Sequence, residues 1–213
     1  MHRLMPDAAG TSNPTIDDLL ARMRDLESEI QEEHARNRGK VAFVVDNNRA
    51  RFALDVLTHH RLHRVGVWQY LRESRWLVAL TAPVAYLGFV PFALLDLFVT
   101  LYAHTCFRVY GIHAVRRADY LVFDRSDLSY LNVIERFNCF YCSYGNGVAA
   151  YFREVAARTE QYWCPIKHAR RMIAAHERYP KFFEFGDAQA YRAGLDRLRE
   201  TLKDGEAGKA ASR

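Results

Sequence analysis

An apolar run is the dominant pattern along the chain. It lies between Arg75 and Arg108, is 32 residues long and contains a single formal charge, Asp96. An apolar stretch of about 18 residues is already typical of a membrane helix, and the alternative is the buried central helix of a soluble bundle. As one straight helix the run would be about 48 Å long, well beyond a hydrocarbon core of about 30 Å. We therefore expect a membrane segment that bends.

The bend is predicted near the middle of this run, where Pro83, Gly88 and Pro91 lie. Proline removes a helical hydrogen-bond donor and clashes with the preceding turn. The two arms would then be residues 76–88 and 91–107, each about 20–25 Å long. Because arms of that length are too short for two full spans, the pattern favours a membrane-inserted helical hairpin.

Basic residues flank the run on both sides. Residues 49–75 carry a net charge of +4, and residues 108–117 contain three arginines and no acid. Because positive charge stays on the cytoplasmic side of a membrane, both ends of the hairpin are expected there. Asp96, inside the run, is either a proton or substrate contact or a residue at a shallow depth near the headgroups.

The first helix is predicted to begin at Thr15, which is placed to cap it, with Asp18 three residues later. Its apolar residues recur at spacings of three and four, as in a coiled-coil seam, and they are Ile16, Leu19, Met23, Leu26 and Ile30. Two heptads are short for a coiled coil. We therefore expect docking onto the rest of the chain, with an oligomer contact through residues 16–30 as the alternative.

The remaining pattern predicts further helices and two interruptions. Residues 40–70 are interpreted as a helix broken near Asn47 and Asn48, although V-A-F-V-V at 41–45 could form a short strand. The sequence Y-G-N-G at 144–147 is a strong indication of a turn. The helices expected after the hairpin cover residues 128–138, 148–163, 165–178 and 188–203, the last capped by Asp187.

These elements divide the chain into five parts. They are a flexible tail (1–14), N-terminal amphipathic helices (15–75), the membrane hairpin (76–107), a cytoplasmic helical region (108–205) and a second flexible tail (206–213). The predicted fold class is therefore all-α, with a membrane-inserted helical hairpin and a cytoplasmic helical bundle.

The composition agrees with a folded protein at a membrane. Of the 213 residues, 50% are hydrophobic and 26% are charged, which excludes wholesale disorder. The formal net charge of +5 suits an anionic membrane face or a nucleic acid. The apolar run makes the lipid bilayer the simpler partner, and no nucleic acid is expected. Four cysteines are too few for a disulfide scaffold, and no secretory signal is expected at the N-terminus.

Three of the four cysteines and one histidine have the spacing of a metal site. Cys139 and Cys142 form a C-x₂-C pair, Cys164 and His168 form a C-x₃-H pair, and 21 residues separate the two pairs. Cys164 would begin the helix at 165–178, where the helix dipole lowers a thiol pKa, and His168 would follow one turn later. A closed Cys₃His set suits zinc best, and an iron–sulfur cluster is the alternative.

The same residues permit other interpretations. Cys139 and Cys142 could cycle as a dithiol at the membrane face, or the cysteines could be inert small residues of a core. Glu154, Glu160 and His176 are candidate acid–base groups, with a solvated helix face as the alternative. The sequence contains no nucleophile elbow, no phosphate-binding loop and no H-E-x-x-H zinc motif. Whether the protein is an enzyme is left open.

The stretch N-C-F-Y-C-S-Y-G-N-G, followed by R-T-E-Q-Y-W-C-P-I-K-H-A-R-R, resembles a family of small uncharacterised bacterial membrane-associated proteins. The shared motif is C-x-x-C…W-C-P-x-x-H, and the resemblance covers roughly residues 90–175. It implies a bacterial inner-membrane setting and one site made of the two cysteine-containing pairs. It implies no substrate.

Two functions are expected from these observations. The first is a membrane-anchored protein that binds zinc through Cys139, Cys142, Cys164 and His168 and acts as an interaction or assembly module on the cytoplasmic face of the inner membrane. Its expected partners are the lipid bilayer and another membrane protein. The second is a membrane-bound redox protein or enzyme that uses an iron–sulfur cluster or the Cys139/Cys142 dithiol on a quinone or lipid.

Overall fold

The computed structural model describes residues 14–38, 43–46, 49–74 and 76–210. Within these ranges the chain is mostly helical, as the all-α prediction requires. The chain divides into two compact units, one ending at Leu57 and the other beginning at Thr58. Each unit is described by itself below.

The first unit contains one long helix and a β-hairpin. Helix α1 spans Pro14–Arg38, so it begins one residue before the predicted cap at Thr15. Strands β1 (Phe43–Asp46) and β2 (Arg49–Phe52) pair antiparallel, with Phe43 opposite Phe52. The helix predicted from residue 40 is therefore wrong at residues 43–46 and 49–52, and the strand alternative is confirmed for residues 43–45. The β-branched valines favour extended backbone there. The break predicted at Asn47 and Asn48 lies outside the described residues.

Two short helices lead toward the apolar run. Helix α2 spans Leu54–Leu62 and helix α3 spans Val67–Glu73. Both lie largely within the region expected to be helical, but residues 63–66 interrupt the single helix predicted there as far as residue 70. Gly66, the residue before α3, has an extended backbone and carries no side chain that could cap the helix.

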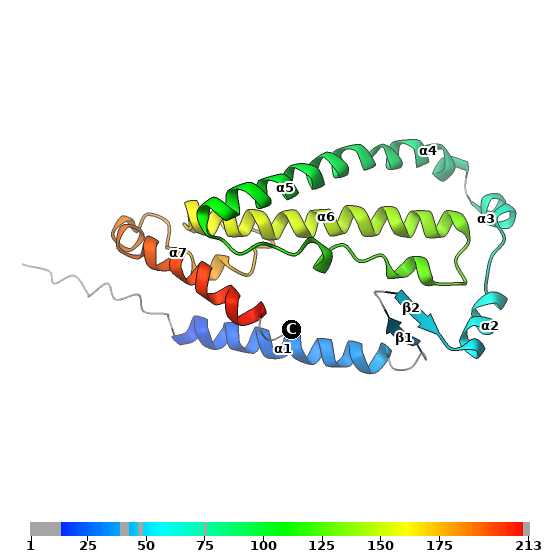
Figure 1. The fold of residues 1–213 in the computed structure, drawn as a ribbon, viewed down its shortest axis with the longest axis horizontal. Coiled ribbons are helices and arrows are strands. Elements are labelled where there is room, and N and C mark those ends of the chain that lie inside the picture. The colour runs from blue at the N-terminus through cyan, green and yellow to red at the C-terminus, as the bar shows by residue number, and fades with distance from the viewer. Residues whose placement is uncertain (1–13, 39–42, 47–48, 75, 211–213) are drawn as a thin grey trace, which may run out of the picture. The chain divides into compact units, whose positions relative to one another are not determined.

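The apolar run forms one helical rod instead of the predicted hairpin (Figure 1). Helix α4 (Trp76–Leu87) and helix α5 (Phe89–Tyr110) are separated by Gly88 alone. Gly88 keeps a right-handed helical backbone, with φ −57° and ψ −18°, and its carbonyl accepts a hydrogen bond from the Phe92 N–H at 3.2 Å. Pro91 lies in the first turn of α5, where a missing N–H costs little.

Helix α5 ends at Tyr110, and the next residue, Gly111, has a left-handed φ of 67° that is typical of a C-terminal cap. The chain then returns beside the helix that follows, through residues 111–132, which we call the return segment. It contains two short 3₁₀ turns, Arg117–Asp119 and Asp124–Asp127. The predicted helix over 128–138 therefore begins later. Asn132 caps it in a capping box with Glu135.

Helix α6 spans Val133–Trp163 without interruption, so the turn predicted at 144–147 is wrong. The glycines of that sequence serve close packing. A Cβ on Gly145 would lie 2.7 Å from the Phe92 ring, and a Cβ on Gly147 would lie 2.8 Å from the Tyr120 carbonyl oxygen. Helix α5 and the return segment can therefore approach α6 more closely than a larger side chain would permit.

The chain after α6 is irregular, so the helix predicted at 165–178 is wrong. A bridge between Ile166 and Phe183 joins the two ends of this segment. Helix α7 (Ala188–Ala210) follows where the last helix was predicted, although it extends past 203. The Asp187 carboxylate accepts a hydrogen bond from the Ala190 N–H at 2.8 Å, which confirms the predicted cap.

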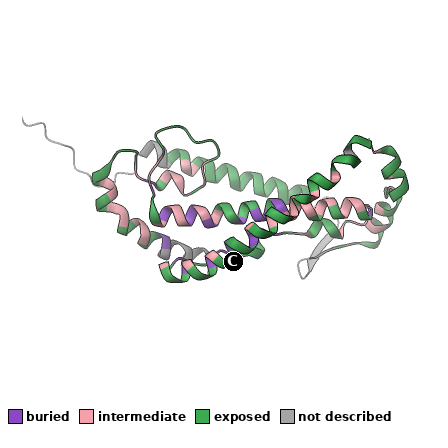
Figure 2. Ribbon diagram, turned by 90° about the horizontal axis from the view of Figure 1, so that it is seen from above, coloured by how far each residue is buried: buried purple, intermediate pink, exposed green. Residues whose placement is uncertain are grey.

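The second unit has one core, between α5, α6, α7 and the return segment. Its members are coloured as buried in Figure 2, and they are Val99, Ala103, Phe107, Ile112, Val115, Leu121, Val148, Tyr151, Val155 and Leu202. Helix α6 packs against α5, α7 and the return segment, so it is the central helix of this unit.

The packing at Gly147 is testable by substitution. Gly147→Val should lower the free energy of unfolding by about 1–3 kcal/mol, because the added side chain meets the backbone of the return segment. Gly66→Val is the matched control: nothing lies within 4 Å of the added Cβ, so stability should stay close to wild type. Thermal unfolding followed by circular dichroism in detergent measures both. Equal effects of the two substitutions would contradict the close packing.

Candidate functional site

The continuous α6 separates the predicted metal ligands. Cys139 and Cys142 lie in its first half, and Cys164 follows its last residue. At about 1.5 Å per residue, the 22 residues from Cys142 to Cys164 span about 33 Å. Ligands of one zinc ion lie about 2.3 Å from it, so these thiols cannot share an ion.

The predicted metal-binding function is therefore wrong. Within the described ranges, no group of three or more histidine, cysteine or acidic side chains is arranged to hold a metal ion. The error came from the turn expected at residues 144–147, which would have folded the two cysteine-containing pairs together. A helix that runs straight through that sequence leaves them at opposite ends.

Cys164 also has a different electrostatic setting from the one predicted. It caps the C-terminus of α6 instead of beginning a helix, so it faces the negative end of a helix dipole. Burial and the nearby Glu160 raise the pKa of the Cys164 thiol above its ordinary value. A raised pKa disfavours the reactive thiolate at neutral pH. His168 lies in the following loop, where its ring stacks on Tyr179, and all four cysteines are free thiols.

The most distinctive surface of the second unit is an exposed apolar row along α4 and α5. We call it the outer face. Its side chains recur at helical spacing, each is 61–80% exposed, and they are Leu80, Val84, Leu87, Leu94, Phe98, Leu101 and Val109. Among the described residues, Ala79–Tyr110 is the one helix long and apolar enough to cross a membrane, and few of its residues are buried. The core helix of a soluble bundle would be mostly buried instead.

The opposite side of α5 packs on protein, and we call it the inner face. Val99, Ala103 and Phe107 are at most 7% exposed there. Nearer the start of the helix, aromatic rings of α5 meet those of α6: Phe89 lies edge-on to Tyr141 with ring centroids 4.8 Å apart. Helix α5 is therefore apolar on both sides, and only its inner face is covered by protein.

The single charge of the apolar run belongs to the inner face. Asp96 is 8% exposed, and both of its carboxylate oxygens accept hydrogen bonds from the Arg117 guanidinium, at 2.8 and 2.5 Å. The Tyr144 hydroxyl donates a third hydrogen bond at 3.1 Å, and Thr100 lies 3.5 Å away. These contacts occupy Asp96 with protein partners, so they give no support to a role as a proton or substrate contact. The other expected role, a shallow position near the headgroups, stays a prediction. The carboxylate joins α5 to the return segment and α6.

Sequence reasoning did not identify Arg117 as the partner of Asp96. Arg117 was predicted only as one of the basic residues that flank the apolar run, and its contact with Asp96 was not predicted. The one available indication was that a carboxylate inside an apolar helix needs a cationic or hydrogen-bonding partner. Spacing alone could not choose that partner among the nearby arginines.

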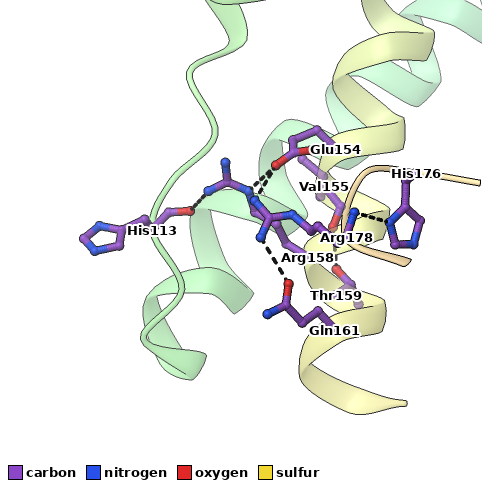
Figure 3. A network of polar contacts seen from close by, with 8 residues as sticks. All are labelled: His113, Glu154, Val155, Arg158, Thr159, Gln161, His176 and Arg178. Carbon is purple, nitrogen blue, oxygen red and sulfur yellow. Dashed lines mark hydrogen bonds and ion pairs between the residues drawn. The ribbon is translucent and has the colours of Figure 1, made fainter. Parts of the chain in front are cut away.

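A second polar network fastens the far half of α6 (Figure 3). Arg158 donates to the Glu154 carboxylate at 2.7 Å and to the His113 carbonyl of the return segment at 2.9 Å. Arg178, from the loop after α6, donates to Glu154 at 2.9 Å and to Gln161 at 3.1 Å. Glu154 is thus a shared acceptor within a half-buried network.

The other two candidate acid–base groups form a pair of their own. His176 Nε2 lies 2.9 Å from the Glu160 carboxylate, and His176 Nδ1 accepts a hydrogen bond from the Arg178 N–H. The His176 side chain is 12% exposed and packs against the rings of Tyr179 and Phe182. This pair holds the loop against α6, as the network around Glu154 does.

The charge state of Glu154 follows from these contacts. Burial raises the pKa of Glu154, but the hydrogen bonds and charges of Arg158 and Arg178 together outweigh burial. The pKa therefore lies below its ordinary value, and the residue is a carboxylate at neutral pH. A carboxylate held by two guanidinium groups is suited to joining segments rather than to accepting protons.

No family model matches the chain, and neither curated proteins nor solved structures match it. The resemblance to bacterial membrane-associated proteins therefore remains a prediction.

Arg117→Ala tests the link at Asp96. The change should lower the free energy of unfolding by about 1–3 kcal/mol, because it leaves a buried carboxylate without its cation. Arg116→Ala is the matched control, since the Arg116 side chain is 75% exposed and lies 3.8 Å from Asp119. That control should change stability by less than about 0.5 kcal/mol. Chemical denaturation in detergent distinguishes them, and similar losses would argue against a special role for Arg117.

Glu154→Gln tests the network through pH. A carboxylate with a lowered pKa stabilises the fold above the unfolded value of about 4.3 and loses that contribution as pH falls through its folded pKa. The variant should therefore melt below wild type at pH 7, and the gap should close under acidic conditions. Glu200→Gln, at an exposed position of α7, should leave both melting curves unchanged. A difference in melting temperature that does not change with pH would show that the charge of Glu154 does not contribute to stability.

Proposed function

We propose that the protein is attached to the cytoplasmic face of the bacterial inner membrane, with the outer face of α4 and α5 embedded in the lipid. The observation that carries this proposal is the apolar row of that face, whose seven side chains are 61–80% exposed. Exposed apolar patches of this extent are uncommon on soluble monomers and are typical of membrane or protein contact.

The geometry of the second unit favours a helix in the plane of the membrane over a helix that crosses it. The return segment and α6 run alongside the inner side of α5, and the return segment carries exposed charges at Arg116, Asp124 and Arg125. In a crossing orientation these side chains would lie at the depth of the hydrocarbon, where each costs about 2.5–3.5 kcal/mol. An in-plane orientation keeps them in water.

An in-plane helix also accounts for the basic flanks. Both flanks of the apolar run are positive, which requires both to stay on the cytoplasmic side. A hairpin would place both flanks on the cytoplasmic side because its second arm returns through the membrane. A helix in the membrane plane does so because it never crosses the bilayer. Trp76, which is 72% exposed at the start of α4, is placed as an interfacial anchor, and exposed Trp163 lies against Tyr110 near the other end.

The double substitution Leu94→Glu/Leu101→Glu tests the attachment. Two charges on the outer face should reduce the vesicle-bound fraction by tenfold or more, because burying each leucine in lipid stabilises binding by about 1.5–3 kcal/mol. The assay is flotation with vesicles of phosphatidylethanolamine and phosphatidylglycerol. Circular dichroism of the same samples shows whether the variant is folded.

Val122→Glu is the matched control for this experiment. Val122 is an exposed apolar residue of the return segment, at 53% exposure, so this variant also places a glutamate at an exposed apolar position, but away from the outer face. The control should float as wild type does. Flotation of the double variant at the wild-type level would refute the proposed attachment, as would an equal loss for Val122→Glu.

A further inference from the structure

Helix α1 carries a second apolar row, and it is exposed among the described residues of the chain. Leu19, Met23, Leu26 and Ile30 follow one another at alternating spacings of four and three, and each is 53–57% exposed. This spacing is that of the a and d positions of a heptad, with Met23 and Ile30 at a and with Leu19 and Leu26 at d. The row is therefore one side of a two-stranded seam.

The charges beside this row are complementary to a second copy of α1 in parallel orientation. Arg22 occupies the g position and Glu27 the following e position, so Arg22 of each copy would face Glu27 of the other. Within a parallel seam, leucine at both d positions and Ile30 at one a position favour two strands. Glu33 ends the apolar row at the next d position, where Arg36 neutralises it within the same helix at 2.6 Å.

A membrane is a poor occupant for the same row. The remaining surface of α1 is mainly acidic, with exposed Asp18, Asp25 and Glu32. Anionic lipid headgroups would repel such a helix, whereas they attract the basic flanks of the apolar run. The lipid-facing row and the α1 row thus differ in the charges that border them.

We propose that two copies of the chain associate through a parallel two-stranded coiled coil of their α1 helices. The seam is about two heptads long, which is short for an independent coiled coil. The inference rests on the proposed membrane attachment in this one respect: confinement to a surface supplies the effective concentration that a short seam needs. Neither unit has to rearrange, because the row is already exposed.

Charge exchange on full-length protein bound to vesicles tests the dimer. Arg22→Glu alone and Glu27→Arg alone place like charges at both symmetric contacts, so each should reduce chemical cross-linking between two differently tagged copies by about tenfold. Mixing the two single variants restores opposite charges at both contacts and should restore cross-linking to the wild-type level. Arg24→Glu changes the same charge at a position away from the seam and should have no effect.

Orientation is tested by a disulfide. In a chain whose native cysteines are replaced by serine, Ile30→Cys should oxidise to a covalent dimer, because a-position residues face their own copies in a parallel seam. Absence of cross-linking in wild type, or no recovery on mixing the charge variants, would overturn the proposal. Cross-linking without the Ile30→Cys disulfide would overturn the parallel register. The floated fraction, measured on the same samples, reports the membrane attachment separately.

Discussion

An ion pair between the buried Asp96 carboxylate and the half-exposed Arg117 guanidinium determines which side of the apolar helix faces the protein. Helix α5 is apolar on both sides, so hydrophobicity alone provides no preference for its rotation about its own axis. Asp96 provides that preference, since its carboxylate must reach the Arg117 guanidinium and the Tyr144 hydroxyl. The side of α5 that carries Asp96 therefore packs on protein, and the apolar row of the outer face stays exposed for contact with lipid.

The same contact ties together three elements that are distant in sequence. Helix α5, the return segment and α6 meet at Asp96, and the second network at Glu154 joins α6 to the return segment and to the loop after it. Between these polar contacts the packing is apolar and close, with Gly145 and Gly147 facing their neighbours. These contacts cover the inner face of α5 and leave the outer face of α4 and α5 exposed.

Local sequence patterns predicted the helices well where a cap or a long period marked them. Helix α7 begins after Asp187 as expected, and the apolar run is helical throughout. The patterns failed where a residue serves a partner far along the chain. Gly145 and Gly147 indicate a turn by local rules, but their neighbours are Phe92 and the backbone of Tyr120.

The error at these glycines explains the error in the site. Cys139, Cys142, Cys164 and His168 have metal-ligand spacing only if the chain folds back between the pairs. Spacing along a sequence is a distance in space only when the intervening backbone is known, and here that backbone is one helix. The proposed function depends instead on the exposure of the apolar side chains of the outer face. That exposure cannot be predicted until it is known which side of α5 packs on protein.

The depth of α4 and α5 in a bilayer tests the central claim most directly. Spin labels at positions 80, 94 and 109, in a chain bound to vesicles, report depth through their relative accessibility to oxygen and to a water-soluble nickel complex. The in-plane arrangement predicts the same shallow depth at Leu80, Leu94 and Val109, with oxygen accessibility high at all three. A deep label at 94 between two shallow labels would show that the helix crosses the membrane, and exposure of all three to nickel would show that it does not enter lipid.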